Sequence, residues 1–406
     1  MSALVEWRFV RLGQLAEVRT GLSKNRGREG PTITRPYLRV ANVQDGRLDL
    51  SDVQEIDVPS AQVARFTLQK GDLLLIEGNG NPENLGRGCL WNGQIPGAVH
   101  QNHVFAVRVR PDAGLLPKFL ELQVQSDFGR GYFLSSAKGS TGLSTLNSRQ
   151  IDAFPIYLPP INVQERIVST VGEWTRSIEV TERLIKAKRR VLDYLRQKLY
   201  VEGAQGWSPR KLGQVLREHG GTSSGVEPVY SVSVHKGLVD QIEHLGRSFA
   251  ASDTSHYNLV RPGDVVYTKS PTGDFPYGVV KQSHVMADVI VSPLYGVFTP
   301  ASPDIGLLVD FFFESPVQSL NYLRPLVQKG AKNTIAITND GFLAGSVRLP
   351  CNDAAERAAA ALVRDARREI AVLADEAAAL RTQRRGLMQK LLTGKWRVPT
   401  DEGVTA

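Results

Sequence analysis

LRQKLYVEGAQGWSPRKLGQV, residues 195–215, joins two segments that both occur elsewhere in the chain. Its first five residues, LRQKL at 195–199, return as LMQKL at 387–391. Its last five, KLGQV at 211–215, match RLGQL at 11–15. A junction that matches both ends of the same chain indicates a tandem duplication, and this duplication decides the fold.

Further matches keep the same order along the chain. They are WRFVRLGQLAEV (7–18) with WSPRKLGQVLRE (207–218), LQKGDLLLIEG (68–78) with LVRPGDVVYTK (259–269), and YLPPINVQER (157–166) with RLPCNDAAER (348–357). One unit is therefore roughly 190 to 200 residues long, which is too long for a solenoid repeat and predicts two domains of one kind. LMQKLLTGKW (387–396) also ends on a tryptophan, as if RLGQL should follow it. This circular plan predicts that residues near 7 and 396 lie close together.

Composition narrows the function classes before any motif is considered. The chain has 406 residues, 42% of them hydrophobic and 22% charged, as in ordinary globular proteins of more than one domain. It has no apolar run of the ~20 residues that a membrane span needs, and MSALVEW lacks the regions of a signal peptide, so we expect a cytoplasmic protein. The excess of 49 basic over 41 acidic residues, a net charge of +8, favours an anionic partner, with nucleic acid first.

Two kinds of segment alternate in each unit. Short apolar runs such as YLRVANV, DLLLIEG and DVVYT, broken by glycine and proline, predict β-strands. RLGQLAEV (11–18), LLPKFLELQVQS (115–126) and IGLLVDFFFES (305–315) predict short helices between them. We therefore expect α/β domains joined by long helices, and divide the chain into a first α/β domain (1–155), a central helix (156–203), a second α/β domain (204–350), a distal helix (351–396) and a tail (397–406).

Residues 162–202 and 353–395 predict two long helices, with Asn162 and Asp353 as their N-caps. Apolar residues recur in alternating steps of four and three, with Thr181, Lys188 and Arg384 among the exceptions, and each position of the second helix lies 192 residues after its counterpart. This spacing favours a coiled coil between the helices over two amphipathic helices that each pack on their own domain. The predicted seam consists of Ile167, Val171, Trp174, Ile178, Ile185, Leu192, Leu195, Leu199, Val363, Ile370, Leu373, Leu380, Leu387 and Leu391.

The order RLGQLAEV, PYLRVANVQDG, KGDLLLIEGNG, HQNHVFAV, GLSTLNSRQI, LPPINVQERIV and LRQKL resembles the specificity subunit of type I restriction–modification systems. The resemblance covers residues 7–396, including the duplication. The second unit is more divergent, because it has LPCNDAAER in place of LPPINVQER and no evident counterpart of PYLRVANV.

The resemblance implies a fold and a function for both units. Each α/β domain would be a target recognition domain that reads one half of a bipartite DNA site, and an antiparallel coiled coil would set the spacer. The subunit would bind no cofactor itself and would act near the nucleoid in defence against phage. Its partners would be double-stranded DNA, two modification subunits that methylate adenine with S-adenosylmethionine, and two restriction subunits that use ATP and Mg²⁺.

Catalytic motifs give an independent test of a non-catalytic role. An amino-methyltransferase needs an N/D-P-P-Y/F loop, whereas the single PP dipeptide here follows Leu158. No G-x4-G-K-S/T motif is present for ATP binding. His100 and His103 have no accompanying cysteines or third ligand for a metal, and Cys89 and Cys351 form no CxxC pair. A self-contained restriction or methylation enzyme, or a coiled-coil scaffold without DNA specificity, remains the alternative reading.

Polar, glycine-rich loops are the candidate DNA-reading segments, because base edges are read by Arg, Lys, Asn, Gln, Ser and Thr. The alternative for each residue is a solvated loop or a turn-stabilising group. AKGST (137–141) and QKGAKNT (328–334) occupy matched places in the two units, which favours a shared binding face. The candidates are Lys24, Arg26, Arg28, Asn79, Asn81, Arg87, Gln101, Asn102, Lys138, Ser140, Thr141, Ser144, Asn147, Lys269, Ser270, Thr272, Gln328, Lys329, Lys332, Asn333 and Thr334.

Overall fold

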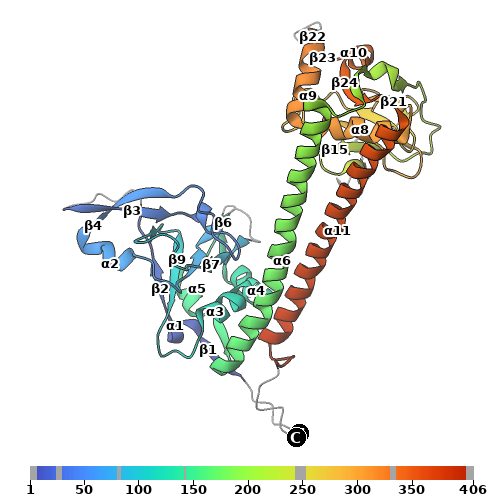
Figure 1. The fold of residues 1–406 in the computed structure, drawn as a ribbon. Coiled ribbons are helices and arrows are strands. Elements are labelled where there is room, and N and C mark those ends of the chain that lie inside the picture. The colour runs from blue at the N-terminus through green and yellow to red at the C-terminus, as the bar shows by residue number, and fades with distance from the viewer. Residues whose placement is uncertain are drawn as a thin grey trace. The chain divides into compact units, whose positions relative to one another are not determined.

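The computed structural model describes residues 7–23, 30–79, 84–140, 143–242, 253–329 and 335–398. The chain forms two compact units, Met1–Thr181 with Glu376–Ala406, and Glu182–Asp375. Each unit combines one globular domain with one part of each long helix, as Figure 1 shows. No helix among the described residues is both long enough and apolar enough to cross a membrane.

An antiparallel sheet of strand order β2-β9-β5-β7 forms the centre of the first unit. Its strands are β2 (Ala16–Thr20), β5 (Leu73–Ile76), β7 (Gly88–Leu90) and β9 (Val104–Val109). Smaller sheets surround it, made of β1 (Arg8–Arg11) with β12 (Pro155–Leu158), of β4 (Gln54–Pro59), β3 (Thr32–Leu38) and β8 (Val99–His100), and of β10 (Lys138–Ser140), β11 (Leu143–Thr145) and β6 (Gly78–Asn79). The helices of the domain are α1 (Leu12–Leu15), α2 (Val63–Phe66), α3 (Pro117–Gln125), α4 (Asp127–Ser136) and α5 (Ser148–Asp152).

Strand β5 is apolar at every position because both faces of the central sheet are covered. Successive side chains of a strand point to opposite faces. Leu73 and Leu75 enter the core that includes helix α3, whereas Leu74 and Ile76 enter a second core around Trp91. All four residues of LLLI are completely buried, so this run lies between two hydrophobic cores of the domain.

The second unit repeats the four-stranded central sheet, with smaller strand pairs around it. Its central sheet has the order β14-β21-β18-β19, and the further pairs are β13 with β24, β15 with β16, β17 with β20, and β22 with β23. Their bounds are β13 Trp207–Lys211, β14 Leu216–Glu218, β15 Tyr230–Ser233, β16 Gly237–Asp240, β17 Asn258–Val260, β18 Val265–Tyr267, β19 Val280–Gln282, β20 Val289–Val291, β21 Gly296–Pro300, β22 Gln328–Lys329, β23 Ile335–Ala336 and β24 Ser346–Pro350. The helices are α8 (Pro303–Phe313), α9 (Pro316–Leu323) and α10 (Asn339–Ala344).

The strand registers locate a repeat that the sequence comparison missed. Tyr37 of β3 pairs in parallel with Val99, and Val229 forms a parallel bridge with Ile290. Val229 lies 192 residues after Tyr37, and Ile290 lies 191 residues after Val99. These are the offsets found elsewhere in the duplication. The second unit therefore has a structural counterpart of PYLRVANV that is not evident in its sequence. The counterpart of PYLRVANV is PVYSVSV (228–234), which shares few residues with it.

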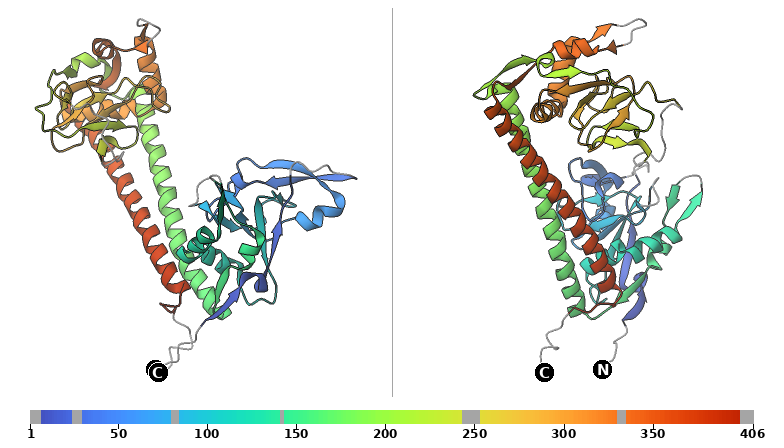
Figure 2. Two further views of the ribbon diagram at one scale, coloured as in Figure 1. Left: turned by 180° about the vertical axis from the view of Figure 1, so that it is seen from behind. Right: turned by 90° about the vertical axis from the view of Figure 1, so that its right-hand side faces the viewer.

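The long helices are α6 (Ile161–Arg196) and α11 (Asp353–Leu392), and they lie side by side within each unit (Figure 2). In the first unit, Arg384 Nη1 donates to Thr175 Oγ1 at 3.2 Å. In the second unit, Lys188 Nζ lies 2.5 Å from Glu369 Oε2. The start of α6 thus meets the end of α11, and the end of α6 meets the start of α11. The helices are antiparallel, and the predicted architecture of two α/β domains with an antiparallel coiled coil is confirmed.

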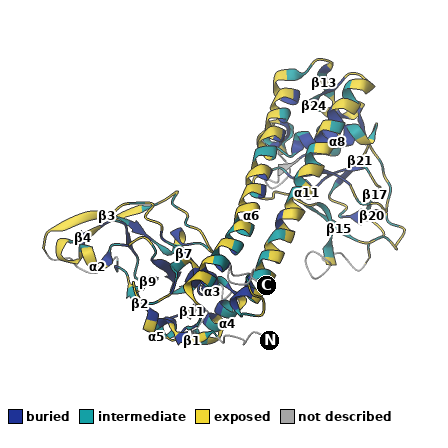
Figure 3. Ribbon diagram, turned by 60° about the horizontal axis from the view of Figure 1, so that its bottom comes forward, coloured by how far each residue is buried: buried dark blue, intermediate teal, exposed yellow. Residues whose placement is uncertain are grey.

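The helix faces follow the four-three pattern, with buried stripes and exposed flanks in Figure 3. Buried along the stripes are Ile167, Val171, Ile178, Ile185, Leu192, Leu199, Val363 and Leu391, and half-buried are Trp174, Leu195, Ile370, Leu373, Leu380 and Leu387. Towards the helix ends the stripe also enters the domain cores, because Ile167 and Leu391 belong to the core of the first unit and Leu192 and Val363 to that of the second. Helix pairing and packing on a domain, treated as alternatives above, therefore occur together.

Several helix boundaries differ from those expected. Helix α6 begins at Ile161, and the Pro160 carbonyl accepts from the amides of Val163 and Gln164, so Asn162 lies inside the first turn and is not the N-cap. The cap of α11 is Asn352, whose Oδ1 accepts from the Ala355 amide, and not Asp353. The segment RLGQLAEV is helical only over Leu12–Leu15 and continues as strand β2, whose side chains join the central sheet.

The segments near residues 7 and 396, at the two ends of the duplication, lie close together in the first unit. Gly394 lies against the ring of Trp7. Trp7 and Trp396 line one pocket of about 210 Å³. The prediction that residues near 7 and 396 lie close together is confirmed. At the other repeat boundary, α6 continues as a π-helical segment, Gln197–Gly203. Leu199 and Trp207 are separated by more residues than Leu391 and Trp396, and this segment takes up the added length.

Candidate nucleic-acid interface

The loop HQNH (100–103) follows strand β8 and is fixed by its own main chain. The Leu22 amide donates to the His100 carbonyl oxygen at 2.8 Å, and the Asn102 amide donates to the Leu22 carbonyl oxygen at 2.9 Å. The Gln101 amide donates to Leu38, also at 2.9 Å. Because a loop with paired main-chain groups has little freedom, the side chains of HQNH project from a preset framework.

Other predicted segments converge on this loop. The Glu77 amide donates to the His103 carbonyl oxygen at 2.9 Å, and the Leu146 amide donates to the Glu77 carbonyl oxygen at 2.6 Å. Strand β6, which follows Glu77, pairs with β11 through Asn79 and Ser144. Three of the four candidate loops of the first domain therefore meet at one place.

Some candidate side chains already hold the fold together. Gln101 Oε1 accepts from the Val40 amide at 3.2 Å, and Arg87 Nη2 donates to the Val40 carbonyl oxygen at 3.3 Å. Asn147 is the N-cap of α5, because its Oδ1 accepts from the Gln150 amide at 3.0 Å. The turn-stabilising reading thus accounts for these contacts without any DNA.

The side chains of Glu77, His103 and Asn102 form a chain of contacts in the same place. His103 Nδ1 lies 2.5 Å from Glu77 Oε2, and His103 Nε2 lies 3.3 Å from Asn102 Nδ2. His103 is about half exposed, whereas His100 is 2% exposed. Glu77 and His103 were not among the candidates, since the partner of a histidine in a loop cannot be identified before the strands are paired.

His100 has a structural role. Its Nδ1–H donates to the Val104 carbonyl oxygen at 2.6 Å, and burial lowers the pKa of the imidazole to about 4. Among the residues that the structure describes, no three His, Cys, Asp or Glu side chains are grouped to hold a metal ion. Both cysteines are free thiols.

The remaining candidates of the first domain and several of the second lie outside the described residues or have no described side chain. Outside the described residues lie Lys24, Arg26, Arg28, Asn81, Thr141, Lys332, Asn333 and Thr334. The backbone but not the side chain is described for Asn79, Lys138, Ser140, Ser144 and Lys329. The β10–β11 and β22–β23 pairs are nevertheless both antiparallel, so Lys138–Ser140 and Gln328–Lys329 lie in equivalent strand pairs.

The second domain places Lys269, Ser270 and Thr272 after strand β18. Lys269 has φ +57°, the one left-handed non-glycine backbone among the described residues, and such strain is frequent at functional sites. Its side chain is half-buried, and burial lowers the pKa of its amine. Ser270 and Thr272 are exposed on the turn that ends at Phe275, and Gln328 is exposed on β22.

A buried aspartate supports the central sheet of the first domain. Asp72 Oδ2 accepts from the Gln69 amide at 2.8 Å and closes the turn at Gly71, whose φ of +96° favours glycine. Arg108 on β9 donates to both Asp72 oxygens at 2.7 Å. The pair ties the start of β5 to its neighbouring strand.

The duplicated aspartate, Asp264, keeps the turn but has different partners. Its Oδ2 accepts from the Arg261 amide at 2.8 Å. Thr299, at the position of Arg108, donates to Oδ1 at 2.9 Å, and His219 Nε2 lies 2.9 Å from Oδ2. The framework is thus retained while its polar partners have changed.

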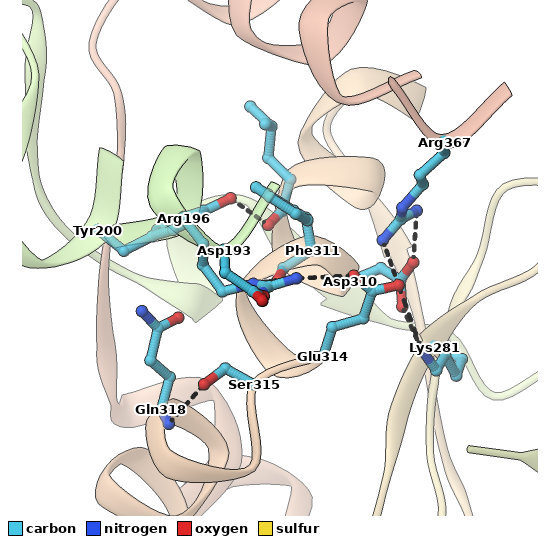
Figure 4. Close-up of polar contacts among 11 residues, drawn as sticks. Asp193, Arg196, Tyr200, Lys281, Asp310, Phe311, Glu314, Ser315, Gln318 and Arg367 are labelled. Atoms are coloured by element: carbon cyan, nitrogen blue, oxygen red, sulfur yellow. Dashed lines mark hydrogen bonds and ion pairs between the residues drawn. The ribbon is translucent and has the colours of Figure 1, made fainter. Parts of the chain in front are cut away.

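A charged cluster holds the second domain on its helices (Figure 4). Arg196 of α6 donates through Nε to the Phe311 carbonyl oxygen and through Nη2 to Glu314, both at 2.9 Å. Arg367 of α11 lies 2.9 Å from Asp310 of α8 and 2.9 Å from Glu314, the residue that follows α8. The Phe311 ring is 4.4 Å from the Arg196 guanidinium carbon and 5.7 Å from that of Arg367. One short helix, α8, therefore links both long helices to the domain that they carry.

Comparison with known proteins agrees with this architecture. Residues 4–188 match the family model described as "Type I restriction modification DNA specificity domain". The type I restriction enzyme EcoKI specificity subunit of Escherichia coli is 26% identical over 195 residues, 47% of this chain and 41% of that protein. The putative type I restriction enzyme MjaX specificity subunit of Methanocaldococcus jannaschii is 21% identical over 97% of this chain and 95% of its own length.

A solved structure shows the same fold. The type I restriction–modification S subunit from M. genitalium has a TM-score of 0.54 at 13% identity and covers 96% of this chain and 98% of its own. The first curated relatives match this chain over only about two fifths of their own lengths. The family model, the curated relatives and the duplicated domains on antiparallel helices agree: residues 4–188 are similar to the DNA specificity domain of type I restriction–modification systems, and the whole chain shares the fold of an S subunit.

Proposed function

We propose that this chain is the DNA-recognition subunit of a type I restriction–modification complex. Each α/β domain would read one half of a bipartite site in double-stranded DNA, and the antiparallel helices would set the spacer. The observation that carries the proposal is that two domains share one sheet framework but differ in their loops. Equal frameworks with unequal loops suit the recognition of two different half-sites.

The chemistry would belong to the partner subunits. Two modification subunits would methylate adenine with S-adenosylmethionine, and two restriction subunits would use ATP and Mg²⁺. The missing methyltransferase and ATP-binding motifs of this sequence support a non-catalytic role. The complex would act on DNA in the cytoplasm, at the nucleoid.

The outer face of α6 supports partner binding in the second unit. Leu184, Val191 and Tyr194 are 43%, 61% and 62% exposed and lie at heptad-like spacing beside the seam. Their spacing places them on one side of the helix, where a helix of a partner can pack. We assign this stripe to a modification subunit.

The decisive experiment is a methylation map. The chain would be expressed with its adjacent modification subunit in a host without adenine methylation, and methylated adenines would be mapped across the genome. A bipartite, asymmetric motif is the expected result. Methylation by this chain alone would favour a self-contained enzyme, and the absence of any motif would favour a coiled-coil scaffold.

Two engineered chains separate the roles of domain and helix. Replacing residues 204–350 by those of another family member should change one half of the motif only. A change in both halves would contradict the assignment of one domain to one half-site. Inserting one heptad into each long helix should change the spacer and leave the bases unaltered, so an unchanged spacer would rule out the helices as its determinant.

A further inference from the structure

The framework around HQNH is duplicated, but its exposed side chains are not. The amide of Val104 donates to the Gln101 carbonyl oxygen at 2.9 Å, and the equivalent Tyr295 amide donates to Ser292 at 3.0 Å. The parallel bridges at Val99 and Ile290 flank this turn in the two domains and fix the correspondence between them.

Three side chains differ at this shared turn. With the offset of 191 residues, Asn102 and His103 correspond to Pro293 and Leu294. Glu77, at the offset of 192, corresponds to Lys269. The Glu77–His103–Asn102 chain therefore exists in the first domain only. The contact is therefore not part of the shared sheet framework, as expected of side chains that read one half-site only.

With His103 neutral, the hydrogen bonds orient the amide of Asn102. A carboxylate only accepts, so His103 Nδ1 donates its proton to Glu77. In the neutral ring, Nε2 then accepts, and the Asn102 group facing it at 3.3 Å must be the NH₂ donor. These contacts use one N–H of Asn102. They leave its second N–H and its carbonyl oxygen for a ligand.

An amide with one N–H and one carbonyl oxygen matches one base in the major groove. Adenine offers the N7 acceptor beside the N6 donor, and asparagine binds both atoms at once. We propose that Asn102 reads an adenine in the half-site of the first domain, and that His103 and Glu77 are positioning residues that hold its amide in the reading orientation. This inference rests on the proposed function.

The test measures base preference at each position of the site. The full chain, wild type or variant, would be expressed with its modification subunit for methylation mapping. Its binding to duplexes that carry every single base-pair change would also be measured. Asn102→Ala should lose about tenfold or more of the discrimination at one A·T pair in one half-site and leave the other half and the spacer unchanged.

The positioning residues give a graded series. His103→Ala and Glu77→Ala should reduce discrimination at the same base pair by a smaller factor. Glu77→Gln should retain the discrimination that Glu77→Ala loses, because a side-chain amide oxygen still accepts from His103 Nδ1. Asn92→Ala is the matched control, since Asn92 is exposed on another turn of the same domain. It should leave the motif intact.

The possible failures are distinct. If wild type shows a bipartite motif and Asn102→Ala retains it, the inference is wrong and the proposed function stands. Weaker binding of Asn102→Ala to all sequences equally would also overturn it, because a phosphate contact or a folding defect has no base preference. If wild type has no motif at all, the proposed function and the inference both fall.

Discussion

Arg196 and Met388 occupy equivalent positions 192 residues apart, near the ends of α6 and α11, and both are buried in their units. Arg196 joins the charged cluster on α8, whereas Met388 belongs to the hydrophobic core of the first domain. One difference between LRQKL and LMQKL thus puts a buried, ion-paired side chain in one unit and a buried apolar side chain at the same place in the other.

Arg196→Ala should lower the free energy of unfolding by about 2–3 kcal/mol, because it removes three hydrogen bonds and leaves a gap beside Phe311. Arg196→Met should lose about 1 kcal/mol, since Glu314 retains Arg367 and a long apolar side chain fills the space. Urea unfolding of the full chain measures both. Arg189→Met, on the exposed face of α6, is the control. Equal losses for Ala and Met would contradict the role of packing at this position.

The end of α11 should stabilise the first domain. Leu391 is 3% exposed and lies in the same core as Ile167 and Phe119. Leu391→Ala should cost about 3 kcal/mol, and hydrogen exchange should become faster in β1 and β12. Leu362→Ala on the same helix is the control, because Leu362 is 58% exposed. Faster exchange confined to 182–375 would show that Leu391 supports the other unit.

The two duplicated aspartates should respond unequally to removal of their charge. Asp72→Asn leaves Arg108 without its partner next to the buried sheet and should cost about 3 kcal/mol. Asp264→Asn should cost about 1 kcal/mol, because the Arg261 amide can still donate to the amide oxygen and the Thr299 hydroxyl can accept from the new NH₂ group. Thermal or urea unfolding of the single variants tests this. A larger loss at Asp264 would mean that His219 carries more of the stability than the geometry indicates.

His100 should make the first domain sensitive to acid. Burial lowers its pKa to about 4, whereas an unfolded histidine titrates near 6.5. Between these values the unfolded chain binds a proton that the folded chain does not, so the free energy of unfolding falls as the pH is lowered. From about pH 7.5 to about pH 5 this amounts to about 2 kcal/mol.

His100→Asn should reduce that acid loss, because its amide can still donate to the Val104 carbonyl oxygen and does not titrate in this range. Urea unfolding at both pH values gives the difference. His256→Asn, at an exposed histidine of the second unit, should leave the loss as it is in wild type. An equal loss in the His100 variant would assign the effect to other groups.

Periodicity predicted the helices well because it is a local signal. The seam from Ile167 to Leu391 could be recognised since each helix buries one stripe, whatever lies against it. Both N-caps were predicted wrongly, because Asn162 and Asp353 have side chains that can cap a helix and only the preceding strand decides which residue begins the first turn.

The site was harder to predict because its contacts join distant segments. Gln101 and Arg87 resemble DNA-reading residues in sequence, yet both bond to Val40, about 50 or more residues away along the chain. Glu77 and His103 carry no motif, and they meet only once β5, β8 and β9 are placed. Side-chain chemistry is visible in a sequence, but the partner of each side chain depends on tertiary structure.

The division of the chain also affects the order in which it can fold during synthesis. The second unit is one continuous segment, whereas the first unit needs Met388, Leu391 and Leu392 to complete its core. Domains of most proteins fold from the N-terminus as the ribosome releases them. Here the first domain cannot complete its core until α11 has been synthesised. The second domain can therefore reach its native state earlier. A nascent chain released before that helix would carry a finished second domain and an open first one.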